Sequence, residues 1–299
     1  MLVDAASLYF RAFFGVPESV TAPDGMPINA VRGYLDMTAT LLQRRRPSRY
    51  VACLDLDWRP AFRVRLLPSY KAHRMAPGGG EQIPDTLVPQ VPVLLDVLAA
   101  LGLATAGARG FEADDVIATL ATRDCEPCEV VSGDRDLMAL ATERVTILYT
   151  GRGVAKLEVL GPDEVAARYG VPAARYADFA VLRGDASDGL PGVNGIGAKT
   201  AASLVVRFGT VESIVEAARN RSSGFPAGAA TKVLAAEDYL LAAPAVVRGR
   251  TDVPVETLED TVPAEPADPG ALVTLADRYG LEPSFNRVLN AMAAARSAR

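Results

Sequence analysis

The stretch GDASDGLPGVNGIGAKT, residues 184–200, carries two chemical signals side by side. Asp185 and Asp188 offer carboxylate oxygens, the hard ligands that suit Mg²⁺ or Mn²⁺. The glycines that follow predict a turn that opens a helix, where exposed backbone N–H groups let a polyanion approach closely. The stretch therefore predicts a divalent-metal site next to a phosphate-binding hairpin between helices.

The glycine turn matches neither of the common nucleotide loops. Ala198 stands where a Walker A loop requires its second glycine, and Thr200 stands where a dinucleotide fingerprint requires its third. A helix-hairpin-helix turn remains, in which Gly195, Gly197, the helix N-terminus and Lys199 would hold phosphate without reading bases. An ordinary helix-capping loop explains the glycines about equally well, and the adjacent aspartate pair favours the phosphate-binding interpretation.

The first half of the chain alternates between strand and helix signals. Short apolar runs predict buried strands at residues 2–3, 50–54, 129–132 and 145–149, with amphipathic helices at 29–46, 89–101 and 112–123. Such alternation favours an α/β fold with a mostly parallel central sheet flanked by helices. We predict an α/β core over residues 1–160 and a helical region over 161–299, with the DNA-binding hairpin at 184–207. Residues 57–81, basic and aromatic and ending in glycines, predict an exposed insertion.

Composition limits the classes of function. With 49% apolar residues over 299 positions, the chain can bury a sizeable core. The net charge of −5 taken alone argues against nucleic-acid binding. The basic residues are concentrated at 44–46, 59–74 and 199–207, however, and the acidic residues form separate clusters, so the net charge conceals basic surfaces that could bind phosphate. Cys125 and Cys128 form a single CxxC without the further ligands that a zinc site needs, so zinc is set aside.

Neither a membrane span nor a secretion signal is predicted. No window approaches the roughly 20 apolar residues that a span requires, and the N-terminus lacks a basic segment followed by a cleavable apolar run. A cytoplasmic location is expected.

Acidic residues recur at the predicted strand ends and helix starts. Each one alone is explained by turn or helix capping. If the strand ends converge, however, several carboxylates share one pocket, and only bound cations or protons relieve their repulsion. Two divalent ions there would activate a water and stabilise a leaving oxygen. His73 is the single histidine in the chain, which leaves histidine-based acid–base chemistry little to work with.

The ordered series of motifs resembles the structure-specific 5′ nuclease family, which includes the flap endonucleases and the 5′-3′ exonuclease domain of bacterial DNA polymerase I. The resemblance covers nearly the whole chain and implies a PIN-like nuclease core with an inserted helical arch. The motifs that carry it are Val3-Asp4-Ala5 with Ser7 to Phe14, Asn29-Ala30-Val31-Arg32-Gly33, Leu54-Asp55, Phe62-Arg63, Tyr70-Lys71-Ala72-His73-Arg74, Glu112-Ala113-Asp114-Asp115, Gly133-Asp134-Arg135-Asp136 and residues 184–200.

By this resemblance, three sets of residues take roles in the site. The metal-site residues are Asp4, Asp55, Glu112, Asp114, Asp115, Asp134, Asp136, Asp185 and Asp188. The catalytic cations are Lys71, Arg74 and Arg11, and the DNA-binding residues are Arg63, Tyr70, Gly195, Gly197, Lys199 and Thr200. Trp58 is left outside the site, since a core role explains it as readily.

The resemblance implies a metal-dependent 5′-3′ exonuclease and flap endonuclease that uses two or more Mg²⁺ or Mn²⁺ ions on flapped, nicked or gapped DNA. A functional link to a DNA polymerase and a ligase is expected. No polymerase region follows residue 299, which predicts a free-standing nuclease. Two alternatives stay open, a PIN-like ribonuclease and a catalytically inactive DNA-junction binding protein. Two features depart from the family pattern: Arg135 stands where many relatives have lysine, and residues 75–80 replace a proline-rich continuation with glycines, which bears on the order of the arch and on substrate preference.

Overall fold

A twisted sheet forms the centre of the computed structural model, which describes residues 1–299 except 124–125, 257–258 and 297–299. The strand order is β3-β2-β1-β4-β5-β6, and every pairing is parallel except that of β5 with β6. The predicted α/β class with a mostly parallel sheet is confirmed. Cys125 of the CxxC motif lies outside the described residues. The strands are β1 (Leu2–Asp4), β2 (Val51–Cys53), β3 (Ala104–Ala106), β4 (Cys128–Ser132), β5 (Val145–Tyr149) and β6 (Glu158–Leu160).

Each face of the sheet has its own apolar core. Leu2, Val51 and Val130, which lie side by side in the register, face the core that includes α5 (Ala113–Arg123). The next residue of each strand faces the opposite core, under the helices α1 (Ala5–Gly15), α2 (Asn29–Arg45) and α4 (Gln90–Leu101). Strands buried on both faces read as continuous apolar runs, which is why β1, β2, β4 and β5 were visible in the sequence.

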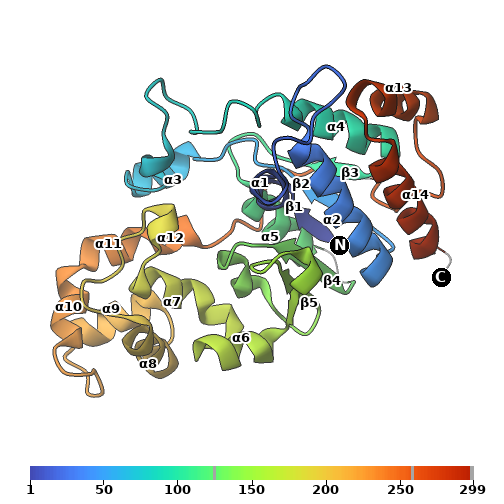
Figure 1. Ribbon diagram of the computed structural model, residues 1–299. Helices are drawn as coiled ribbons and strands as arrows, with labels where there is room; N and C mark the ends of the chain where they lie inside the picture. The colour runs from blue at the N-terminus through green and yellow to red at the C-terminus, as the bar shows by residue number, and fades with distance from the viewer. Residues whose placement is uncertain (124–125, 257–258, 297–299) are drawn as a thin grey trace.

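The helices that follow the sheet separate into two groups (Figure 1). A helical lobe lies to the lower left and comprises α6 (Pro162–Tyr169), α7 (Tyr176–Arg183), α8 (Ala198–Phe208), α9 (Val211–Arg219), α10 (Ala229–Ala235), α11 (Glu237–Ala242) and α12 (Pro244–Val247). The last two helices, α13 (Pro269–Tyr279) and α14 (Glu282–Arg296), pack instead against α4 and α2. No helix in the described ranges is long and apolar enough to cross a membrane.

The insertion at 57–81 contains only two short helical segments. They are α3 (Ala61–Leu66) and the 3₁₀ turn η1 (Ala72–Arg74), and a single antiparallel bridge joins Met75 to Glu81. The expected helical arch is therefore a mostly irregular segment in this structure. Its base, around residues 63–74, is docked onto the rest of the molecule through contacts described below.

Candidate active site

An acidic pocket with a cavity volume of about 240 Å³ opens at the carboxyl ends of β1, β2 and β4. Parallel strands present their carboxyl ends at one edge of the sheet, so Asp4, Asp55 and Asp134 meet there. Glu112 and Asp114 reach the same pocket from the start of α5. These five predicted metal-site residues therefore lie together.

Burial and mutual repulsion disfavour the charged form of two carboxylates in this pocket, Asp4 and Asp114. Burial raises the pKa of Asp4 to about 7, and the nearby Asp55 adds to the effect. Burial also raises the pKa of Asp114 well above its usual range, assisted by Asp134 and Asp4. Asp114 forms no ion pair within the described residues. Crowded carboxylates of this kind take up protons or bind cations.

A second acidic group adjoins the pocket where α7 is followed by the loop to α8. Burial, then Asp134, Asp188 and Asp185, raise the pKa of Asp136 well above its usual range. Asp185 behaves differently, because hydrogen bonds from Ser187 and the nearby arginines outweigh its partial burial and lower its pKa. In the described part of the chain, no three carboxylates enclose an ion site by themselves. Ions would therefore need water or phosphate oxygens to complete their coordination, which is usual for Mg²⁺.

Asp115 lies outside both acidic groups. Its two oxygens accept hydrogen bonds from Arg63 Nη1 and Nη2, each at 2.7 Å, and the backbone N–H of Arg250 donates to it at 2.8 Å. Arg63 also donates to Glu112 at 2.7 Å, as does the hydroxyl of Tyr70 at 2.8 Å. Arg63 is 2% exposed and Tyr70 is 5% exposed. Asp115, Arg63 and Tyr70 thus belong to a buried ionic network, in which each has a partner within the protein.

Two cations of the insertion reach the acidic groups. Lys71 Nζ forms an ion pair with Glu112, and Arg74 Nη2 lies 3.0 Å from Asp188 Oδ1. The backbone of the two segments is equally close, since Lys71 N donates to Asp188 O at 2.9 Å. Gly189 has φ +70°, and a β-carbon there would collide with the carbonyl oxygen of Ser69. This glycine lets the base of the insertion sit directly on the loop that carries Asp188.

The predicted hairpin joins α7 to α8. Gly184 and Gly192 both have positive φ, and a β-carbon on either would stand within 2.8 Å of backbone atoms next to the other. Beyond this close crossing, Gly195, Gly197 and Lys199 are exposed on one turn at the start of α8, with the half-buried Thr200 after them. Lys232 of α10 donates to the carbonyl of Gly195 at 3.0 Å. The turn therefore presents the N-terminus of α8, where no side-chain cap is found among the described residues, and two lysines to solvent.

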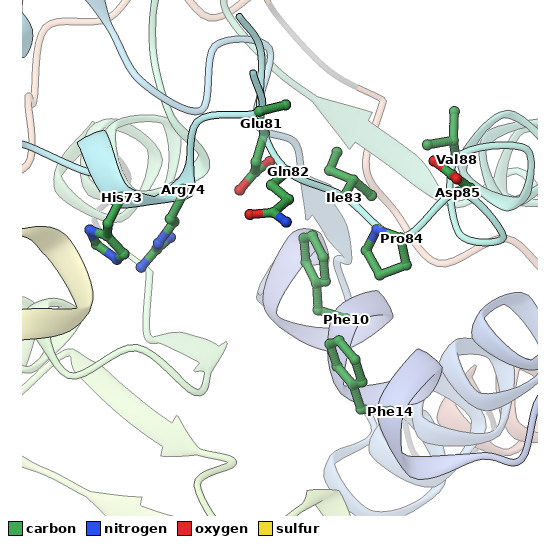
Figure 2. A pocket seen from close by; sticks show the side chains of 11 residues that line it. Phe10, Phe14, His73, Arg74, Glu81, Gln82, Ile83, Pro84, Asp85 and Val88 are labelled. Atoms are coloured by element: carbon green, nitrogen blue, oxygen red, sulfur yellow. The ribbon is translucent and has the colours of Figure 1, made fainter. Parts of the chain in front are cut away.

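A larger groove of about 1020 Å³ runs beside the acidic pocket. Phe10 and Phe14 of α1 form one wall, and Gln82, Ile83 and Pro84 pass opposite them (Figure 2). His73 and Arg74 lie at one end of the groove (Figure 2). Phe10, Arg74 and Glu81 line both cavities, so the groove is continuous with the acidic pocket.

Sequence reasoning did not place Glu81 or Trp58 in the site, although both line the acidic pocket. Glu81 closes the insertion, and Trp58, left out of the site, follows Asp55 by three positions. Glu81 follows no strand, so no pattern marked it. The position of Trp58 just beyond a strand-end aspartate was the available signal.

Comparison with known proteins places this geometry in a family. The model of the N-terminal resolvase-like domain of 5′-3′ exonucleases matches residues 1–170, and the model of their C-terminal SAM fold matches residues 171–269. The chain belongs to the 5′-3′ exonuclease family. It is 52% identical to a 5′-3′ exonuclease of Mycobacterium tuberculosis, with 98% of this chain and 97% of the relative covered. It is also 36% identical to DNA polymerase I of the same species, where 99% of this chain covers 32% of the polymerase.

Solved structures share the fold of this exonuclease-family chain at low sequence identity. The T5 5′-exonuclease with bound zinc ions aligns with a TM-score of 0.64 and 19% identity, covering 99% of this chain and 98% of that one. Human GEN1 in complex with Holliday junction DNA aligns with a TM-score of 0.62 and 14% identity, covering 97% and 70%. The predicted nuclease fold with its helical second half is confirmed.

Proposed function

We propose that this chain is a divalent-metal-dependent nuclease that hydrolyses phosphodiesters in the 5′ strand of branched DNA. It acts as a 5′-flap endonuclease and 5′-3′ exonuclease in replication and repair. The observation that carries the proposal is a set of crowded carboxylates, several without a cationic partner among the described residues, beside a hairpin whose turn is exposed at the start of α8. The named activity of the 52% identical relative supports it.

The metal proposed is Mg²⁺ or Mn²⁺, with two or more ions per site, because every available donor is a hard carboxylate oxygen. When bound, such ions would activate the attacking water and stabilise the leaving 3′ oxygen. Asp115 is omitted from the proposed ligands. The ligands are drawn from Asp4, Asp55, Glu112, Asp114, Asp134, Asp136, Asp185 and Asp188.

The protein's own cations and aromatics have separate tasks in this proposal. Lys71 and Arg74, now paired with Glu112 and Asp188, stabilise charge on the scissile phosphate once metal binds those carboxylates. The hairpin holds the duplex backbone, and Phe10 and Phe14 offer stacking surfaces to the unpaired 5′ strand in the adjoining groove. We further propose a cytoplasmic location and action alongside a DNA polymerase and a ligase.

The test incubates a labelled 5′-flap duplex, a nicked duplex and single-stranded RNA with wild type and with Asp188→Ala, in Mg²⁺, Mn²⁺ or chelator. Flap cleavage that requires metal and is lost in Asp188→Ala is expected. Equal cleavage of single-stranded RNA would instead indicate a ribonuclease. Binding of flap DNA without cleavage in either metal would indicate a junction-binding protein.

A Lys71→Ala variant separates chemistry from binding. It should slow the cleavage step more than it weakens duplex binding, because its charge acts on the transition state. Equal loss of both would reduce Lys71 to a positioning residue.

A further inference from the structure

Three side chains of the insertion converge on one carboxylate of the acidic pocket. Oε2 of Glu112 accepts hydrogen bonds from the Tyr70 hydroxyl at 2.8 Å and from Arg63 Nη1 at 2.7 Å. Oε1 of Glu112 forms the ion pair with Lys71. Glu112 is only 3% exposed, yet it lines the acidic pocket together with Lys71. One oxygen of this carboxylate is thus held by two buried groups, and the other meets a cation that itself lines the pocket.

The Tyr70 side chain is fixed in its direction toward Glu112. Its ring lies within cation–π distance of two cations, with Lys71 Nζ 5.2 Å and the guanidinium carbon of Arg63 5.9 Å from the ring centroid. Its backbone carbonyl accepts a hydrogen bond from Arg59 Nε at 2.6 Å. The ring and the backbone are therefore both held, so the hydroxyl has a fixed place from which to donate to Glu112.

The backbone between these residues has an unusual conformation. Lys71 has a φ of +48°, which few residues other than glycine adopt. Its backbone N–H donates to the carbonyl of Asp188 at 2.9 Å, which helps to hold this turn. Such strained conformations persist where the surroundings fix them, and they are frequent at functional sites. With this turn, the adjacent side chains of Tyr70 and Lys71 both reach Glu112.

We propose that Tyr70 is a positioning residue for the metal site. Its hydroxyl holds Oε2 of Glu112, so that Oε1 is the oxygen that exchanges Lys71 for a divalent ion. Carboxylates that bind metal are commonly oriented by hydrogen bonds of this kind. The inference rests on the proposed function and adds to it a residue whose buried hydroxyl acts through Glu112.

The first test measures metal binding without any substrate. Tyr70→Phe keeps the ring and its contacts with both cations, and removes only the hydroxyl. Metal-free protein is titrated with Mn²⁺, and the free ion is followed by electron paramagnetic resonance. The half-saturating Mn²⁺ concentration should rise about tenfold in Tyr70→Phe, as is usual when a hydrogen bond to a metal ligand is lost. An unchanged Mn²⁺ affinity would overturn the proposal.

A double-mutant cycle tests whether the hydroxyl acts through Glu112. In a Glu112→Gln background the charged ligand is already gone, so adding Tyr70→Phe should change Mn²⁺ affinity by less than about twofold. If Tyr70→Phe weakens Mn²⁺ binding by the same factor in both backgrounds, the hydroxyl does not act through Glu112 and the proposal fails.

A matched control is available in Tyr50. This residue is fully buried, and its hydroxyl lies 3.1 Å from that of Tyr34. Tyr50→Phe should lower the melting temperature and leave Mn²⁺ affinity unchanged. If Tyr50→Phe weakens Mn²⁺ binding as much as Tyr70→Phe does, the effect is a general loss of stability and the proposal fails.

The second test addresses the DNA-binding role that the sequence predicts for Tyr70. Binding of a labelled 5′-flap duplex is measured in chelator, where the metal site has no part. Tyr70→Phe should bind this DNA as wild type does, because the hydroxyl is directed at Glu112. Weakened DNA binding with unchanged Mn²⁺ affinity would make Tyr70 a DNA-binding residue and overturn the proposal.

Failure of this inference is distinguishable from failure of the proposed function. Cleavage of flap DNA by wild type in Mn²⁺ tests the nuclease activity. If wild type binds Mn²⁺ without cleaving, the nuclease proposal fails, while the Mn²⁺ titrations still decide the role of Tyr70. If wild type cleaves and Tyr70→Phe binds Mn²⁺ equally well, only the role of Tyr70 is refuted.

Discussion

Asp114 and Asp115 are neighbours at the start of α5, yet they stand in opposite electrostatic environments. Asp115 is fully buried and gives both of its oxygens to Arg63. Asp114 lines the acidic pocket without an ion pair in the described chain, and burial raises its pKa. A buried carboxylate with a bidentate arginine is already satisfied and serves the fold. One without a cationic partner is left for an ion that the protein does not itself supply.

The same comparison applies to two arginines. Arg63 is buried and saturated by Asp115, Glu112 and the carbonyl of Val246. Arg11 has a buried nitrogen without a partner in the described residues. The two arginines therefore differ in the same way as the two aspartates, although both residue types look alike in the sequence.

The largest expected effect is a loss of folding stability when Asp115, the carboxylate paired with Arg63, is replaced. Asp115→Ala should destabilise the protein by about 3–5 kcal/mol, because it leaves the buried charge of Arg63 uncompensated. Denaturant unfolding followed by circular dichroism measures the change. The double variant Arg63→Met with Asp115→Leu removes both charges and should be more stable than Asp115→Ala. An Asp115→Ala protein as stable as wild type would show that the network contributes nothing.

The next largest effect is a loss of activity when Asp114, the carboxylate without an ion pair in the described chain, is replaced. Asp114→Asn should lower kcat for flap cleavage by more than about a hundredfold, since it removes a charged ligand from the proposed metal site. Its stability without metal should be equal to or above that of wild type, because a raised pKa already disfavours the charged form. Substantial activity in Asp114→Asn would remove this residue from the site.

A pH series sharpens the comparison further. The pKa of Asp4 is about 7 in the folded protein, and its reference value is 3.8. The folded state therefore holds a proton that the unfolded state has lost, so metal-free stability should fall as the pH rises from about 4 to about 7. The slope assignable to Asp4 is at most about 1.4 kcal/mol per pH unit. Thermal unfolding of wild type and of Asp4→Asn is measured over the same pH values. The difference between the two series isolates the contribution of Asp4.

Added Mg²⁺ should stabilise wild type increasingly over the same pH range, because deprotonated carboxylates bind it. A metal-free stability difference between wild type and Asp4→Asn that does not change with pH would contradict the raised pKa of Asp4.

The smallest effect is expected at the exposed edge of the second acidic group. Arg135 lies 2.9 Å from Asp185, with 41% of its side chain exposed. Arg135→Lys should change stability by less than about 1 kcal/mol, as is usual for exposed ion pairs. A larger loss, measured by thermal unfolding, would make this pair part of the structural network.

The sequence predicts both the sheet and the acidic pocket from its buried strands. Apolar runs buried on both faces identify β1, β2, β4 and β5, and the aspartates that follow such strands must converge at one edge. The edge strands β3 and β6 are only partly buried, so neither gave the continuous apolar run that identifies a central strand. Asp114 and Asp115 could not be distinguished, because the partner of Asp115 is 52 positions away. The burial of Arg63 and Tyr70 could not be predicted either, because the sequence of the insertion does not reveal which of its residues are buried.

The central claim is that the carboxylates of the acidic pocket, of which Asp4, Asp114 and Asp134 form no ion pair within the described residues, form the metal centre. Anomalous diffraction from crystals soaked in Mn²⁺ tests it most directly. The account predicts ions bound by Asp4, Asp114 and Asp134, with the contacts between Asp115 and Arg63 unchanged. Ions bound by Asp115 with Arg63 displaced, or an acidic pocket that stays empty at saturating Mn²⁺, would contradict it.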